Sequence, residues 1–439
     1  MPLLLDNARV FTASLFKDLI SDQSAANVYF TFGKHTAWAN DASPDAANTS
    51  LGQRRAVWKS MVGAKRLTGN DVLHCIPRYD WSANTVYTQY DQNSLVLGQD
   101  NVKFYVVTSD FNVYKCLYNN GGSNSTVEPT ATNPATITQT ADGYTWKYMY
   151  SIPTSEQIRF TTGAYIPVKE LTSDDGSLQW DVQDQATDGA IYGITLLSGG
   201  SGYSNGSNLV VSIAGDGTGA TATANINLTS GAVHTISLTD YGSGYTNAAV
   251  TISGGAGSGA TAKALIGPFG GHGAKPLFEL FGKNLILNPR LINNEGDILS
   301  VANDFRQIAI IKDPLTYGDL AAAGNSAYKL TTDLTVSGPG ADYVEDEYVY
   351  QGASLATATF YGTVVEYDST NTVVKVTNTA GTPISDPLIG ANSAASKYVT
   401  SIDYPDLKMY TGEILYIDNI EPIVRNINQT ESFKITIKF

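Results

Sequence analysis

The stretch YFTFGKHTAW, residues 29–38, combines a short aromatic strand with the turn that ends it, and the interpretation of the fold starts there. Because successive side chains of a strand point to opposite faces, Phe30 and Phe32 are predicted to share one face, and the residues beside them the other. Gly33 is expected to permit the turn, since glycine adopts backbone conformations that other residues avoid. The Gly-Lys-His ending has three interpretations: a phosphate cradle, a catalytic base or the edge of a packed sheet.

The composition limits the classes of protein that the chain can belong to. Its 439 residues exceed the roughly 250–300 at which single cores stop growing, so two to four domains are expected. A net charge of −14 provides no basic field for nucleic acid or for an anionic membrane surface. Charged residues make up only 15% of the chain, against a typical ~25%, and there are 26 tyrosines. This composition predicts a β-rich protein with large, weakly charged surfaces that suit packing against other proteins.

The cysteines and the N-terminus indicate a soluble chain or a member of a soluble assembly. Cys75 and Cys116 are too few for a disulfide framework, and we expect free buried thiols. The first residues lack the basic segment and the unbroken apolar segment of a signal peptide. No run of ~18 apolar residues predicts a membrane-spanning helix.

The order of patterns along the chain predicts a mainly β protein with some α structure. Apolar residues at three- and four-residue steps near the N-terminus, from Leu4 to Ile20, predict an amphipathic helix with a packing face that includes Phe11 and Leu15. A mixed α+β core is expected over residues 1–185, 270–325 and 403–439. Two inserted all-β modules are expected to interrupt it at residues 190–267 and 328–402, the second the size of a small barrel or sandwich.

The first predicted module contains an internal repeat. The Gly-Tyr pair that ends in Tyr203 recurs 42 residues later at Tyr245, and a Gly-Ala-Thr-Ala block recurs after it. Each copy reads as short strands joined by glycine turns, and two stacked copies would bury each other's apolar faces. The glycine-rich segments GDGTGAT and GGAGSGAT lack the Gly-Lys-Ser/Thr ending of a phosphate loop and precede no periodic helix. They therefore predict β turns.

A search for chemistry identifies no catalytic, cofactor or metal site. The four histidines lie at no spacing typical of a zinc site, and no cofactor fingerprint or carboxylate pair is recognisable. The acidic run from Asp342 to Glu347 lacks the pattern of a calcium loop; it is interpreted as a solvated entry to a strand, with an adventitious ion as the alternative. We therefore expect a protein that is not an enzyme, and the opening stretch is interpreted as architecture.

Eight blocks of sequence, taken in order, resemble the baseplate wedge protein of T-even-type contractile-tailed bacteriophages, the gene-eight product family. The resemblance covers about residues 1–170, 275–315 and 405–439. Both predicted β modules look like additions to the compact T-even version. The blocks are YFTFGKHTAW, WKSMVGAKRL, IPRYDW, VYKCLY, EPT, DGYTWKYMYSIP, FRQIAIIKDPL and the terminal segment that starts at TGEILYI.

The resemblance implies a non-enzymatic late structural protein of the virion, located in the tail baseplate and assembled in the host cytoplasm. It implies a homodimer that binds other wedge subunits, builds the ring around the tail hub and changes shape on contraction, with no cofactor, nucleic acid or membrane. Residues within the matching blocks are assigned structural roles, with direct contact to a partner as the alternative. Arg78 and Asp80 are predicted to form an ion pair or a hydrogen-bonded corner beside Trp81. The structural signature consists of Phe30, Phe32, Gly33, Trp38, Arg78, Asp80, Trp81 and Trp146.

Two other functions remain open from the sequence. In a receptor- or carbohydrate-binding tail protein, Tyr203 and Tyr245 would be exposed aromatic platforms. In a structural subunit they would pack inside the module or against a neighbour. A depolymerase would need two carboxylates about 5–10 Å apart in a cleft, contributed by distant positions.

Overall fold

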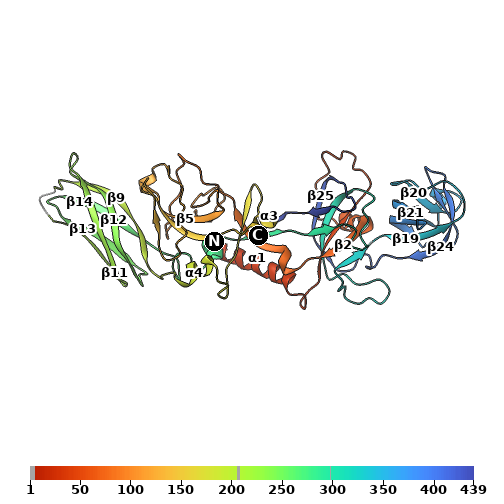
Figure 1. Cartoon of the computed structure of the whole chain (residues 1–439), viewed down its shortest axis with the longest axis horizontal. Helices are drawn as coiled ribbons and strands as arrows, with labels where there is room; N and C mark the ends of the chain where they lie inside the picture. Colours follow the sequence, from red (N-terminus) through yellow and green to blue (C-terminus); the bar gives the residue numbers. More distant parts are fainter. Residues whose placement is uncertain (1–4, 205–207, 297) are drawn as a thin grey trace. The chain divides into compact units, whose positions relative to one another are not determined.

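The computed structural model describes residues 5–204, 208–296 and 298–439, which form two compact units. One unit comprises Met1–Ser14, Leu73–Ile286 and Thr436–Phe439, and the other comprises Leu15–Val72 and Leu287–Ile435. Strands hold 42% of the residues and helices 12%, so the protein is mainly β with a small helical part. The residues predicted to form one discontinuous core are divided between the two units, and each unit also contains one glycine-rich or barrel-forming segment (Figure 1).

The predicted N-terminal helix is present as α1, but its buried face differs from the prediction. Val10, Ala13 and Ile20 are buried, whereas Phe11 and Leu15 are more than half exposed. The small side chain of Ala13 permits close packing of the helix face that contains Val10 and Ala13. The spacing of apolar residues alone does not show which of the two apolar faces is buried. No described helix is both long enough and apolar enough to span a membrane. The described helices are α1 (Asp6–Ser21), α2 (Leu51–Ser60), α3 (Thr154–Phe160), α4 (Leu178–Asp184) and α5 (Pro276–Glu279).

The opening stretch forms the central strand of a five-stranded antiparallel sheet. Its order is β18 (Ala327–Lys329), β2 (Met61–Arg66), β1 (Val28–Gly33), β17 (Phe305–Lys312) and β25 (Glu413–Ile423).

Both faces of β1 are buried, and its side chains alternate as predicted. The Phe30 ring lies 4.8 Å from the Phe433 ring on one face. The Tyr29 ring lies 5.6 Å from the Tyr328 ring on the other, in a cluster that includes Trp58 of α2. β25 stands at an edge of the sheet, where its outer side has no neighbouring strand among the described residues.

A closed six-stranded barrel occupies most of the segment predicted as the second module, drawn in blue in Figure 1. Alternating strand residues fill its interior, among them Leu334, Val349, Val364 and Val376. Closure pairs every strand on both sides and leaves no free edge. The strands, in spatial order, are β19 (Thr332–Ser337), β22 (Val373–Gly381), β21 (Phe360–Asp368), β20 (Tyr348–Gln351), β23 (Pro387–Gly390) and β24 (Ser396–Asp403).

Two four-stranded sheets and a strand pair complete the fold outside the two modules. The C-terminal strand β27 pairs with β15, as expected for a terminus that joins a sheet. Trp146, a predicted structural residue, is fully buried and stacks on Tyr144 at 5.5 Å. The sheets are β4 (Tyr105–Val107), β5 (Asn112–Tyr118), β7 (Thr145–Ser151), β6 (Thr138–Gln139); and β27 (Ile435–Lys438), β15 (Asn284–Leu287), β3 (Val72–Pro77), β8 (Tyr165–Val168); the pair is β16 (Arg290–Ile292) with β26 (Thr430–Ser432).

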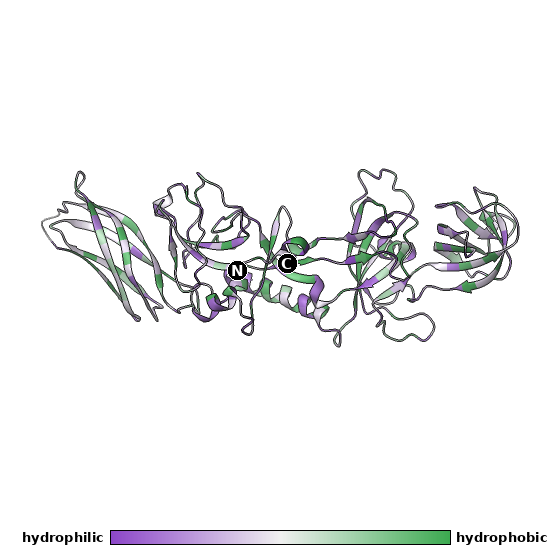
Figure 2. Ribbon diagram, viewed as in Figure 1, coloured by the Kyte–Doolittle hydropathy of each residue, from purple (hydrophilic) through white to green (hydrophobic). Residues whose placement is uncertain are grey.

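The glycine-rich segment forms a six-stranded antiparallel sheet in which the two sequence repeats are related by an approximate two-fold. Ser212 pairs with Thr251, its equivalent in the other copy. Val211 pairs with Ile252 and Ile213 pairs with Val250, and the two-fold exchanges these two pairs. Figure 2 shows apolar and polar residues interspersed along these strands. Their order is β12 (Ala232–Ser243), β11 (Thr218–Asn227), β10 (Leu209–Gly215), β13 (Ala248–Gly254), β14 (Ser258–Ile266), β9 (Ile191–Ser201).

Each repeat inserts its tyrosine against the glycines of the other repeat. A Cβ atom on Gly257 would lie 2.5 Å from Tyr203, and one on Gly217 would lie 2.5 Å from Tyr245. The Tyr203 hydroxyl accepts a hydrogen bond from the Ala260 N–H at 3.3 Å, and Tyr245 makes the equivalent bond in the other copy. Both tyrosines are only 4% exposed. The glycine segments are therefore hairpin turns whose missing side chains make room for tyrosine rings.

The exchanged tyrosines predict that Tyr245→Ala unfolds this sheet at a lower temperature. Removing a buried aromatic ring costs about 3–5 kcal/mol because it leaves a cavity that glycine neighbours cannot fill. Hydrogen exchange monitored by mass spectrometry should show lost protection across β9 to β14, with protection of the barrel unchanged. Tyr361→Ala, at a half-exposed position of the barrel, is the control. Unchanged protection in the Tyr245 variant would contradict this packing role.

Candidate functional site

The backbone leaves the extended conformation of β1 at Lys34, one residue after Gly33. Lys34 has a φ of 52°, in the left-handed region, whereas Gly33 continues the strand. A Cβ atom on Gly33 would lie 2.2 Å from the Ser60 carbonyl oxygen, because β2 approaches closely at a register shift. The predicted turn role of Gly33 is therefore wrong: the glycine is required for close backbone approach, and the lysine makes the turn.

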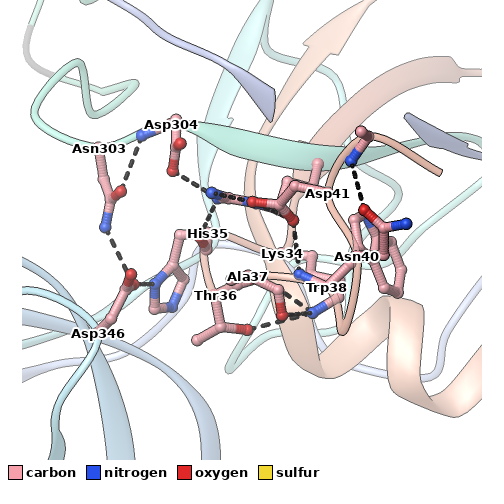
Figure 3. Close-up of polar contacts among 12 residues, drawn as sticks. Lys34, His35, Thr36, Ala37, Trp38, Asn40, Asp41, Asn303, Asp304 and Asp346 are labelled. Atoms are coloured by element: carbon pink, nitrogen blue, oxygen red, sulfur yellow. Dashed lines mark hydrogen bonds and ion pairs between the residues drawn. The ribbon is translucent and has the colours of Figure 1, made fainter. Parts of the chain in front are cut away.

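The loop that follows β1, labelled from Lys34 to Asp41 in Figure 3, is held by Arg306 at the start of β17. The Arg306 Nε lies 3.0 Å from each carboxylate oxygen of Asp41, and its Nη1 donates to the carbonyl of His35. Nη1 also contacts Asp304 at 2.5 Å. Side-chain burial works against the charged guanidinium, but these carboxylate hydrogen bonds raise the pKa of Arg306 above its ordinary value. A mostly buried arginine with these partners restricts residues 34–41 to one conformation.

Lys34 and Trp38 contact each other within this loop. The Lys34 ammonium donates to the Thr36 carbonyl at 2.9 Å and lies 4.2 Å from the centre of the Trp38 ring. Burial, followed by repulsion from Arg306, lowers the pKa of Lys34. The Trp38 indole N–H donates to the Ile420 carbonyl of β25 at 3.2 Å. The lysine thus caps its own loop, and the tryptophan covers one end of the exposed edge of β25.

His35 connects this loop to the barrel. Its Nδ1 lies 2.5 Å from Asp346 Oδ1, just before β20, and its Nε2 lies 2.9 Å from the Thr377 hydroxyl on β22. Burial disfavours the charged carboxylate of Asp346, but the hydrogen bonds from His35 and Asn303 and the nearby positive charges together outweigh burial and lower its pKa. We call His35, Asp41, Arg306, Asp346 and Thr377 the His35 joint, since together they join the barrel to the five-stranded sheet.

The carboxylate, imidazole and hydroxyl of the His35 joint have the chemical order of a catalytic triad, but their burial is reversed. A triad needs an accessible nucleophile and a buried carboxylate. Here Thr377 is buried and His35 is 0% exposed, whereas the Asp346 side chain is 45% exposed. A substrate has no path to the hydroxyl. The arrangement can position the barrel, and its buried hydroxyl does not suit acyl transfer.

The acidic run of residues 342–347 leads into β20 and is mostly exposed, as predicted, but several of its carboxylates also make specific contacts. Asp342 pairs with Lys397 at 3.0 Å, and Asp346 belongs to the His35 joint. Glu347 is buried, and its carboxylate accepts hydrogen bonds from the backbone of Asn392 and Ser393. These carboxylates face different partners, so they do not converge on one ion.

The predicted contact between Arg78 and Asp80 is present. The Arg78 guanidinium makes bonds of 2.8–3.0 Å to both carboxylate oxygens and donates to the Thr162 carbonyl at 3.2 Å. The Trp81 indole donates to Ser125 at 3.2 Å. Since the Asp80 side chain is more than half exposed, this corner contributes little to stability.

The first unit contains a second group of buried charges, which the sequence did not indicate. The Lys115 ammonium lies 2.8 Å from Glu279, and both side chains are almost fully buried. Lys147 donates to the Pro134 carbonyl at 2.7 Å, and burial lowers its pKa to about 8. Burial, followed by the two lysine charges, lowers the pKa of His272 well below its ordinary value. These groups stabilise the interior and line none of the hollows described below.

Among the described residues, no three His, Cys, Asp or Glu side chains group as metal ligands. Cys75 and Cys116 are buried and unpaired, as predicted, and burial raises the pKa of both thiols. Comparison with protein-family models gives no match, and comparison with curated proteins gives none either.

Sequence reasoning placed His35 in an architectural segment but missed its partners. Asp346, Thr377 and Arg306 lie 311, 342 and 271 residues away along the chain. The acidic run singled out in the sequence contains Asp346. The single sequence signal for a partner of His35 was its position directly after an aromatic strand, where a histidine needs hydrogen-bond partners if it is buried. Only the barrel's closure brings the aspartate and the threonine to the two ring nitrogens.

The backbone geometry at the end of β1 predicts opposite responses at two adjacent positions. Gly33→Ala should lower the free energy of unfolding by about 3 kcal/mol, because the methyl group would clash with backbone. Lys34→Gly should change it by less than about 1 kcal/mol, since relief of the left-handed conformation offsets the lost side-chain contacts. Urea unfolding at pH 7 measures both, and equal losses would contradict the assignment.

The lowered pKa of Asp346 predicts how the stability of this unit depends on pH. The unfolded state takes up the proton first, so the stabilisation by the carboxylate is complete above its usual pKa of about 3.9 and is lost as pH falls below it. Asp346→Asn should cost about 1 kcal/mol at pH 7, after allowance for solvent screening, and progressively less between pH 4 and pH 2.5. Urea unfolding across this range measures the difference. Asp184→Asn, at an exposed position of α4, should show no such dependence.

Proposed function

We propose that the protein is a structural subunit of the baseplate wedge of a contractile phage tail. In this role it forms a homodimer, binds neighbouring wedge subunits in the ring around the tail hub, and transmits the change of shape on contraction. The resemblance of eight ordered sequence blocks supports this proposal. Four of the blocks contain β1, β2, β17 and β25, which are adjacent strands of one sheet although β17 and β25 lie hundreds of residues after β1 and β2 in the chain.

The observation that carries the assembly role is the open edge of β25. Residues 413–418 form no backbone hydrogen bond on their outer side in the described part of the chain, and Trp38 covers the edge only further along. An edge strand with unpaired N–H and C=O groups is a template for a strand from another chain. A subunit that binds neighbours can use such an edge for strand addition.

Two adjoining hollows border this edge and give it specific chemistry. One, of about 500 Å³, lies between residues 47–49 and residues 414–417 of β25. The other, of about 300 Å³, lies between α2 and the start of β25, and both are lined by Arg54 and Ile414. Neither Arg54 nor Arg55 forms an ion pair among the described residues. The surface therefore suits an extended segment of a neighbouring subunit that carries acidic side chains.

The carbohydrate-binding interpretation loses the two residues on which it depended. The carbohydrate-binding interpretation required exposed rings at Tyr203 and Tyr245, and both are buried against glycines of the opposite repeat. The hydroxyl that a nucleophilic enzyme would use at the His35 joint is also buried. These observations favour a structural role for the same residues.

The proposal predicts that the tagged protein, purified gently from infected cells, brings down other baseplate proteins in fixed ratios, measured by mass spectrometry. The double variant Arg54→Glu/Arg55→Glu should reduce recovery of at least one partner about tenfold or more, because it repels the acidic segment. Lys59→Glu is the control, since Lys59 is exposed on the same helix and lines neither hollow. Recovery of the protein alone, or equal recovery with all variants, would contradict the proposal.

A further inference from the structure

A pair of adjoining hollows in the first unit has a lining unlike that of the β25 edge. One, of about 270 Å³, lies along β12 next to β5 and β7, and the other, of about 820 Å³, lies along the same strand next to residues 86–89 and 119–123. Tyr118, Asn120 and Thr235 line both, so the two are continuous. We call them together the β12 cleft. The larger hollow by itself is in the range of about 300–1,000 Å³ that is typical of ligand sites, which often lie where two substructures meet.

The lining of the β12 cleft is uncharged. Among the described residues that line it, none is an aspartate, glutamate, lysine or arginine, and His234 is the single titratable group apart from tyrosines. This is unusual in a chain of net charge −14. A charged ligand would lose its hydration there without gaining an opposite charge, so the lining selects for neutral molecules.

Three tyrosine rings give the cleft flat apolar surfaces. Tyr118, Tyr192 and Tyr241 all line its smaller part. Tyr192 is held in place, because its ring lies 4.8 Å from the Tyr241 ring and 5.5 Å from the buried His272 ring. Tyr241 itself is 37% exposed, so one face of the pair is available to a ligand. Rigid aromatic side chains with a polar tip bind molecules that have one apolar and one polar side.

Polar groups without partners surround these rings. The hydroxyls of Tyr118, Tyr241 and Ser237 and the side-chain amide of Gln139 form no hydrogen bond within the described part of the chain. Hydroxyls and amides both donate and accept, and they therefore match hydroxyl groups of either orientation. A pyranose ring has this combination of an apolar C–H face and a hydroxyl-lined edge.

We propose that the β12 cleft is a binding site for an uncharged oligosaccharide. Sugar rings stack on the Tyr192–Tyr241 pair, and their hydroxyls bond to Gln139, Ser237 and Tyr118. This proposal does not depend on the assembly role of β25, which lies in the other unit and uses charged residues. Tyr203 and Tyr245 take no part, because they are buried inside the repeat.

The test uses the full-length protein on a microarray that contains neutral and acidic oligosaccharides, followed by fluorescence anisotropy with the strongest neutral glycan. We expect binding to neutral glycans only. Tyr241→Ala should weaken it about tenfold, the loss expected for one stacked ring. Tyr361→Ala, with nearly the same exposure but located in the barrel, should leave it unchanged.

A second variant keeps the test decisive if Tyr241→Ala disturbs the fold. Gln139 is exposed on the short strand β6, so Gln139→Ala should leave the thermal unfolding temperature unchanged and weaken glycan binding about fivefold. Three outcomes would overturn the proposal: no glycan binds, only acidic glycans bind, or the neutral glycan binds both cleft variants as tightly as the wild type. The co-purification of baseplate partners is a separate measurement. Its outcome does not affect how the glycan-binding result is interpreted.

Discussion

The bonds of the Arg306 guanidinium determine how the second unit is arranged around its central strand. A guanidinium that leaves water must find charged and polar partners, and Arg306 finds them in Asp41, Asp304 and the carbonyl of His35. These bonds hold the loop after β1 in one course. His35 then points at the barrel, where one acceptor and one hydroxyl meet its two ring nitrogens. Loss of Arg306 would free the loop and weaken the hydrogen bonds of His35 to Asp346 and Thr377 of the barrel.

In the glycine-rich sheet, the absence of side chains has the same organising effect as the arginine has in the other unit. Glycines at corresponding turns of the two repeats leave spaces that only the tyrosine of the opposite repeat fills. Neither copy therefore completes its own interior, so the two must fold together. The pairing of equivalent residues across β10 and β13 follows from this exchange. The glycine turns predicted from the sequence therefore also provide the space into which the tyrosines pack.

The two surfaces that we propose for binding have different chemistry and different origins. The β25 edge combines unpaired backbone groups with two arginines, which suits a charged, extended polypeptide. The β12 cleft has no charged lining among the described residues and offers aromatic rings and amides. The two surfaces lie in different units and share no lining residue, so the two proposals are independent of each other. The T-even-like blocks contain β25, whereas the cleft borders a segment that looks like an addition to them.

The sequence by itself determined the local features: a mainly β chain, an N-terminal helix, alternation in β1, a two-copy glycine-rich segment, buried thiols and the Arg78–Asp80 pair. Each depends on residues that are close along the chain, where periodicity and turn chemistry act directly. Only the tertiary structure decided that Lys34 instead of Gly33 makes the turn, that Tyr203 and Tyr245 are buried, and that His35 meets Asp346 and Thr377. These depend on contacts between residues up to 342 positions apart, which are set by strand pairing and closure of the barrel, and no local pattern encodes which distant backbone will approach.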